Sequence, residues 1–243
     1  MSEIYSNDAL KIIQDMNNMS MYQIKFNYPS PSLARSLIKT HIIQGGTIST
    51  DYLTMRFKAN SVVPFNIFRE DYNKIKGKEI LSINLVASML SSLSLQLSHI
   101  ILKEGKTIMG YSPENVIVIN GDVFAFIGSE YLIDIDEECK DDAIISFPFV
   151  SNDFFASPEL LSIKEIPSRV HYKSAYFSLG CLILFALSTS DNFNNLYNDY
   201  LKEPKSVKIY ECLNELNLKN TKFYWLLSRC LVEDPVKRSI YFL

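Results

Sequence analysis

Residues 109–136 restrict the fold of this chain more than any other stretch. Two apolar runs, Val116 to Ile119 and Val123 to Phe126, are separated by the short polar segment that contains Asn120-Gly121. Asn-Gly between apolar runs is the strongest short-range signal for a β-hairpin, because both residues tolerate positive φ. We therefore expect a turn, a strand, a tight hairpin and a second strand here.

Helical periodicity flanks this hairpin on both sides. Residues 80–102 carry apolar side chains at steps of three and four, without Gly or Pro, and are predicted to form the longest helix. Residues 176–187 and 222–232 show two further strongly apolar helical segments. The hairpin is thus expected to open a helix-rich second half.

The remaining segments give weaker signals, which come from spacing, alternation and turn residues. In chain order we expect a short helix over 8–17, a strand over 21–26, a helix from about 30 to 43, a hairpin of strands over 47–57 and 62–68, a charged connector over 71–78, an ordered loop over 140–155 and a partly irregular segment over 191–210.

Composition excludes several classes of protein. The chain has 24 basic and 27 acidic residues and no basic run, which argues against a nucleic-acid partner. The first residues have neither a basic nor an apolar segment, so we expect no signal peptide there. The longest apolar run, residues 179–187, is much shorter than the roughly 20 residues that span a bilayer. We expect no membrane association.

The four cysteines are widely spread and match no metal or disulfide spacing, so we expect reduced thiols and a cytoplasmic or nuclear location. Abundant Asn, Ile, Lys and Ser with only eight Gly is typical of an AT-rich coding genome, such as that of a virus or an intracellular parasite.

Several short motifs follow one another in the second half. After the long helix come Pro113-Glu114-Asn115, the hairpin, Ser157-Pro158-Glu159, an apolar helix that contains Gly180, and Asp234-Pro235 followed by Arg238. This order and spacing resemble the C-terminal lobe of eukaryotic protein kinases. The resemblance implies an α+β, protein kinase-like fold, with a reduced N-terminal β-rich lobe over residues 1–70 and a mainly helical C-terminal lobe over residues 71–243.

The resemblance places the kinase catalytic loop on residues 108–115, where only the terminal Asn115 is kept. The position of the catalytic aspartate is Gly110, which has no side chain to orient a nucleophile. The metal-binding carboxylate of the family falls on Phe126, which offers no oxygen to Mg²⁺. We therefore expect no catalytic residue, no metal and no cofactor.

Three weak candidates for nucleotide binding remain open. A rival alignment places the metal carboxylate at Asp134 or Asp136, and Lys25 could be the strand lysine that contacts phosphates. The helix that follows Lys25 contains no acidic partner, so an exposed strand lysine is the competing interpretation. Asn115 is the third candidate.

The resemblance also implies a buried structural ion pair between Glu159 and Arg238. Pro158, Gly180 and Asp234 belong to the same structural motifs. Because the family keeps these residues for its fold, their presence predicts that the fold is maintained while the chemistry is lost.

Together these observations predict a catalytically inactive protein kinase-like domain, a pseudokinase that acts as a protein-binding, regulatory or scaffolding module. Its expected partners are proteins, with a kinase or a kinase substrate among the candidates. One alternative is a divergent active kinase that uses Asp134 or Asp136 for metal. Another is a structural subunit of a larger assembly.

Overall fold

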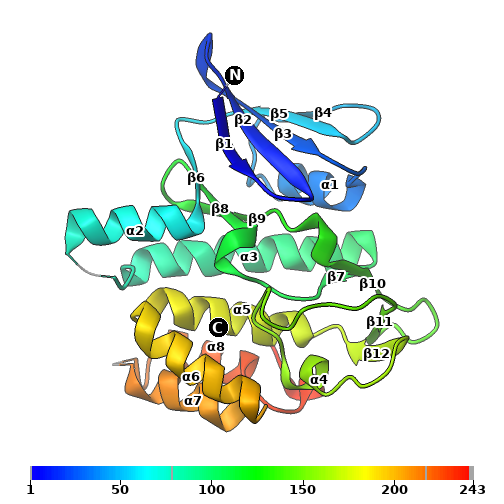
Figure 1. The fold of residues 1–243 in the computed structure, drawn as a ribbon, viewed down its shortest axis with the longest axis vertical. Coiled ribbons are helices and arrows are strands. Elements are labelled where there is room, and N and C mark those ends of the chain that lie inside the picture. Colours follow the sequence, from blue (N-terminus) through cyan, green and yellow to red (C-terminus); the bar gives the residue numbers. More distant parts are fainter. Residues whose placement is uncertain (1, 78, 217, 241–243) are drawn as a thin grey trace.

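The computed structural model describes residues 2–77, 79–216 and 218–240 of the 243-residue chain. The described residues form an α+β structure with eight α-helices and several small antiparallel sheets. The predicted α+β class is therefore confirmed. Figure 1 shows a layer of strands at one end, a layer of helices at the other, and helix α3 between them.

The N-terminal residues form a five-stranded antiparallel sheet with the strand order β1, β2, β3, β5, β4. Its strands are Ser2–Ser6 (β1), Leu10–Asp15 (β2), Asn18–Phe26 (β3), Thr47–Ile48 (β4) and Thr54–Lys58 (β5). Helix α1 (Pro31–Lys39) lies beneath this sheet in Figure 1. Its Leu33 and Leu37 share a buried cluster with Leu10 and Ile24 of the sheet.

The helix predicted for residues 8–17 is wrong, because residues 10–15 form strand β2. Leu10 and Ile12 are fully buried on either side of the exposed Lys11, which is the alternation of a strand. Ile12 also lies directly opposite Ile24 of β3. The apolar spacing of residues 10–15 is compatible with a helix or a strand, and pairing with β3 selects the strand. The strand predicted for residues 21–26 is confirmed within β3.

The hairpin predicted from residues 47–57 and 62–68 is also wrong. The short strand β6 (Val62–Pro64) pairs with β8 (Val116–Ile119) and belongs to a different sheet from β5. Strand β6 therefore connects the N-terminal sheet to the central hairpin.

Residues 65–76 form helix α2 (Phe65–Lys76), where a strand end and a charged connector were expected. Phe65 and Phe68 lie one helical turn apart and both pack edge-on against Phe124, with ring centroids 5.9 and 6.2 Å away. This aromatic packing stabilises the helix. The domain boundary predicted after residue 70 falls inside it.

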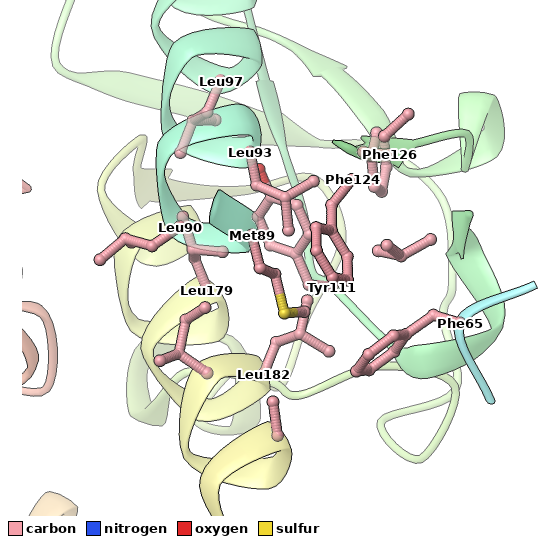
Figure 2. Packing of buried hydrophobic residues seen from close by; sticks show 14 of the residues in the cluster. Phe65, Met89, Leu90, Leu93, Leu97, Tyr111, Phe124, Phe126, Leu179 and Leu182 are labelled. Carbon is pink, nitrogen blue, oxygen red and sulfur yellow. The ribbon is translucent and has the colours of Figure 1, made fainter. Parts of the chain in front are cut away.

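Helix α3 (Ile83–Glu104) is the centre of the molecule. The Ser82 side chain caps its first turn by accepting a hydrogen bond from the Leu85 N–H, and Gly105 ends it with φ 63°, a value that favours glycine. Figure 2 shows Met89 and Leu93 of α3 pointing into a cluster with Tyr111, Phe124 and Leu182. The long helix predicted from the sequence is confirmed.

Among the described residues, α3 is the single helix that is long and apolar enough to cross a bilayer. Length and composition alone do not distinguish such a span from the central helix of a folded domain. Seven residues of α3, including Val86, Leu90 and Gln96, are buried inside the protein. Within the described residues, helix α3 is therefore packed as a core helix.

The predicted Asn-Gly hairpin is confirmed as β8 paired with β9 (Val123–Phe126). Asn120 and Gly121 both have positive φ, 55° and 85°, as a tight two-residue turn requires. The hairpin is preceded by β7 (Lys106–Ile108), which pairs with β10 (Leu132–Asp134).

The rest of the chain is mainly helical. Its elements are β11 (Asp142–Ile145), α4 (Pro158–Leu161), β12 (Ser168–His171), α5 (Ser174–Leu187), α6 (Ser190–Lys202), α7 (Ser206–Glu215) and α8 (Lys222–Cys230). The apolar helices predicted for 176–187 and 222–232 are confirmed as α5 and α8.

Residues 140–155 were expected to form an ordered loop and residues 191–210 to be partly irregular, and both segments contain regular elements. Within residues 140–155, β11 pairs with β12. Residues 191–210 lie in α6 and α7, because Phe193, Tyr197 and Tyr200 recur at helical spacing and are buried on one face. That narrow aromatic stripe lies within a polar sequence, which is why composition did not reveal it.

Candidate functional site

The loop between β7 and β8 carries the residues that the sequence placed in a catalytic loop. Asn115 is 98% shielded from solvent, with an exposed fraction of 2%. Its side-chain oxygen accepts a hydrogen bond from the Ser112 N–H at 2.9 Å, and its Nδ2 donates to the Gly110 carbonyl oxygen at 3.3 Å. Both polar ends of the amide are therefore used to close the loop.

Helix α5 is also hydrogen-bonded to the loop between β7 and β8. The Ser178 hydroxyl accepts a hydrogen bond from the Tyr111 N–H at 2.7 Å, and both residues are fully buried. Sequence reasoning did not predict this contact, because a serine in a strongly apolar helix carries no distinctive local signal. This contact fixes the loop backbone to the helical layer.

Gly110 is covered by an aromatic ring. A Cβ atom added at residue 110 would lie 2.0 Å from Cδ2 of Phe154. Phe154 is itself buried, and its ring packs against those of Tyr131 and Phe149 at centroid distances of 5.4 and 5.7 Å. The Phe155 N–H also donates to the Tyr111 carbonyl oxygen at 2.8 Å, so the segment is tied to the loop. The volume that a side chain at residue 110 would need is filled.

Phe126 lies at the end of β9 and is completely buried. Its ring packs edge-on against Tyr111 at 5.2 Å. Gln96 of α3 donates from Nε2 to the Phe126 carbonyl oxygen at 3.0 Å and accepts from the Phe126 N–H at 2.9 Å. Phe126 is therefore part of the core, and its side chain offers no oxygen ligand to a metal.

The two rival carboxylates are each paired with a cation. Asp134 pairs with Lys106 across the β7–β10 ladder. Asp136 lies 2.6 Å from Nη2 of Arg169 and accepts a hydrogen bond from the Glu138 N–H at 2.9 Å. That backbone hydrogen bond is the largest cause of a lowered pKa at Asp136, and Arg169 adds to it. A cavity opens beside Asn115, and neither of these carboxylates is among the residues that line it.

Lys25 lies on the outer face of β3, opposite Lys11 of β2 and Thr54 of β5, and is exposed to solvent. Helix α1 has no acidic residue; its Arg35 instead forms an ion pair with Glu104 at the end of α3, at 2.5 Å. Of the three candidates for nucleotide binding, Asn115 lines a cavity whose described wall includes neither Lys25 nor Asp134, so the structure does not bring the three together there. These residues do not form a site suited to Mg²⁺ and a nucleoside triphosphate.

Glu159 and Arg238 do come together. Nη1 and Nη2 of Arg238 lie 2.5 and 2.8 Å from the two carboxylate oxygens of Glu159, which is a bidentate pair. Nε of Arg238 donates to the Val232 carbonyl oxygen at 2.7 Å, and the guanidinium lies 5.0 Å from the ring centre of Phe177. This pair joins α4 to the end of the chain.

The accompanying motif residues have structural positions. Pro158 occupies the first turn of α4, and the Asp234 side chain caps the turn that follows it by accepting from the Val236 N–H at 3.0 Å. A Cβ at Gly180 would lie 3.0 Å from Leu231 and 3.2 Å from the Cβ of Cys230. Glycine at 180 therefore allows α5 to approach the end of α8 closely.

A cavity of about 750 Å³ opens beside Asn115, between the N-terminal sheet and the loop. Four carboxylates and three tyrosines line it, and none of the described residues in its wall is Lys, Arg or His. The acidic residues are Asp8, Glu114, Glu130 and Asp153, and the tyrosines are Tyr5, Tyr28 and Tyr131.

The walls of this cavity come from distant parts of the chain. The Tyr5 hydroxyl donates to the Glu114 carbonyl oxygen at 2.8 Å, across 109 positions of sequence. Desolvation raises the pKa of Glu130, and the Asp8 carboxylate raises it further. Partial burial beside Glu130 likewise raises the pKa of Tyr5 and of Tyr131 to about 12. Sequence reasoning missed Tyr5, Asp8 and Asp153, because no local pattern connects them to the loop.

The carboxylates around Asn115 would repel phosphate groups, since none of the wall residues that the structure describes carries a positive charge to balance them. No protein-family model matches this chain, and a search of curated proteins also finds no match.

Proposed function

We propose that this chain is a catalytically inactive protein kinase-like domain that acts by binding other proteins. Its element order supports the proposal: an antiparallel sheet with one helix, a long central helix, a loop and hairpin, and a helical layer. The bidentate pair of Glu159 and Arg238 stabilises that helical layer, as the resemblance implies.

The packing around Gly110 is the main support for the proposed loss of activity. The ring of Phe154 fills the volume beside Gly110, where the resemblance places the catalytic aspartate. A carboxylate at this position would have to displace a buried ring that packs on two other aromatic side chains. Residue 110 therefore has no carboxylate to act as general base, and the volume that one would need is filled.

The other losses act in the same direction. Phosphate transfer depends on a metal carboxylate and on cations that neutralise the developing charge. Phe126 replaces the carboxylate, and Lys25 is exposed to solvent and does not line the cavity beside Asn115. A divergent active kinase that uses Asp134 or Asp136 would first have to separate these residues from Lys106 and Arg169.

A phosphate-transfer assay tests the proposal. The purified chain is incubated with Mg²⁺ and γ-labelled ATP, alone and with casein and myelin basic protein as general acceptors. We expect no label above that of the heat-denatured chain. Transfer that disappears in Asp134→Asn or Asp136→Asn would establish the active alternative.

A further inference from the structure

The cavity beside Asn115 has the chemical character of a site for a positively charged group. Its carboxylates at Asp8, Glu130 and Asp153 take part in no ion pair with any residue that the structure describes. Charges of one sign in a hollow with low-dielectric walls raise the local concentration of the opposite charge. The cavity therefore attracts cations and excludes phosphates.

Its aromatic residues suit the same ligand. Tyr5, Tyr28 and Tyr131 line the cavity together with the carboxylates. Aromatic faces attract Arg and Lys side chains, and tyrosine rings also pack against their aliphatic stems. At about 750 Å³ the cavity is large enough to take such a side chain together with part of the backbone that carries it.

A second cavity, of about 420 Å³, adjoins the first. The two share Ser112, Glu114 and Asn152 in their walls, so the first lies next to the N-terminal sheet and the second next to helix α6, on either side of these residues. On α6 the second cavity is lined by the exposed amides of Asn194 and Asn198. An asparagine amide both donates and accepts hydrogen bonds, which matches the N–H and C=O groups of a peptide backbone.

We propose that the two adjoining cavities bind an extended segment of a partner protein, with an Arg or Lys side chain in the larger cavity and backbone along Asn194 and Asn198. This inference rests on the proposed function and names the chemistry of its partner. Charge complementarity selects the basic side chain, and the amides on α6 favour a peptide over a free amine.

The test uses a fluorescent hexapeptide of alternating Ala and Arg residues and the matched peptide with neutral citrulline in place of arginine. Fluorescence anisotropy measures the binding of each to the full chain. We expect the arginine peptide to bind at least about tenfold more tightly, because citrulline loses the charge-assisted hydrogen bonds. Equal binding of the two peptides, or no binding, would overturn the proposal.

Matched variants locate the site. Asp8→Asn with Asp153→Asn removes two cavity charges, while Asp122→Asn with Glu211→Gln removes two exposed charges elsewhere. We expect the first pair to weaken binding about tenfold and the second pair to leave it nearly unchanged. Equal weakening by both pairs would show nonspecific attraction and overturn the site.

Free L-arginine amide distinguishes a peptide site from a simple cation site. We expect Asn194→Ala with Asn198→Ala to weaken the hexapeptide and to leave the amide unaffected. If the free amide competes as well as the peptide and the asparagine variants change nothing, the peptide part of the proposal is wrong. Phosphate transfer in the separate assay would refute the proposed function whatever the peptide does, and absent peptide binding without transfer would refute this inference alone.

Discussion

Removing the Glu159 carboxylate measures how strongly the Glu159–Arg238 pair holds the helical layer. In Glu159→Gln the Arg238 guanidinium, which is 0% exposed, loses both of its carboxylate contacts. Breaking a buried pair by removing one partner costs about 3–5 kcal/mol. Glu159 is 18% exposed, and Arg238 keeps three backbone carbonyl oxygens, including that of Val232 at 2.7 Å, so the cost falls below that range.

We therefore expect Glu159→Gln to lower the free energy of unfolding by about 2–3 kcal/mol. For a domain of this size that corresponds to a melting temperature lower by roughly 4–12 °C. Urea denaturation followed by circular dichroism measures the free energy, and differential scanning calorimetry measures the melting temperature.

The exposed pair of Asp199 and Lys202 provides the matched control. Its side chains are 61% and 75% exposed, so Asp199→Asn should leave the free energy of unfolding nearly unchanged. A double-mutant cycle with Arg238→Met then isolates the coupling between the two buried charges. A stability change in Glu159→Gln no larger than that of the control would refute the assigned role of the pair.

Three further perturbations test the site and its supports. Gly110→Asp should leave phosphate transfer absent and lower stability by about 1–3 kcal/mol, because its Cβ would overlap Phe154; a gain of transfer would contradict this. Gln96→Leu should cost about 2–4 kcal/mol in urea denaturation, since the Phe126 N–H and C=O both lose their partner inside the core. A hydrogen bond from Arg35 lowers the pKa of Glu104. The stability that the ionised Glu104 contributes is therefore present above about pH 4.3, the ordinary pKa of glutamate, and is lost as the pH falls further. Glu104→Gln should therefore reduce the acid loss of stability between pH 5 and pH 3, and an unchanged pH profile would argue against the pair.

Local signals predicted the elements whose structure depends on neighbouring residues. Asn120-Gly121 specifies a turn by its own backbone preferences, and the hairpin follows from it. Helix α3 has a cap, a glycine stop and uninterrupted periodicity, so its position was nearly correct. The pairing of Glu159 with Arg238 was available only through the resemblance.

Elements decided by distant contacts were not predictable in this way. Residues 10–15 carry spacing that suits either a helix or a strand, and pairing with β3 decides between them. Strand β6 pairs with β8 across more than fifty residues, and no turn connects them. Similarly, the cavity brings Tyr5 to Glu114 across the whole first half of the chain.

The most direct test of the central claim is the melting temperature of the purified chain with and without Mg²⁺ and ATP. A ligand present at one hundred times its dissociation constant stabilises a protein by about 2.7 kcal/mol, which would raise the melting temperature here by roughly 5–10 °C. Because the wall beside Asn115 is acidic and Gly110 is covered by Phe154, we predict a shift of less than about 1 °C even at millimolar nucleotide. A shift of several degrees that requires Mg²⁺ and is lost in Asp134→Asn would contradict the account.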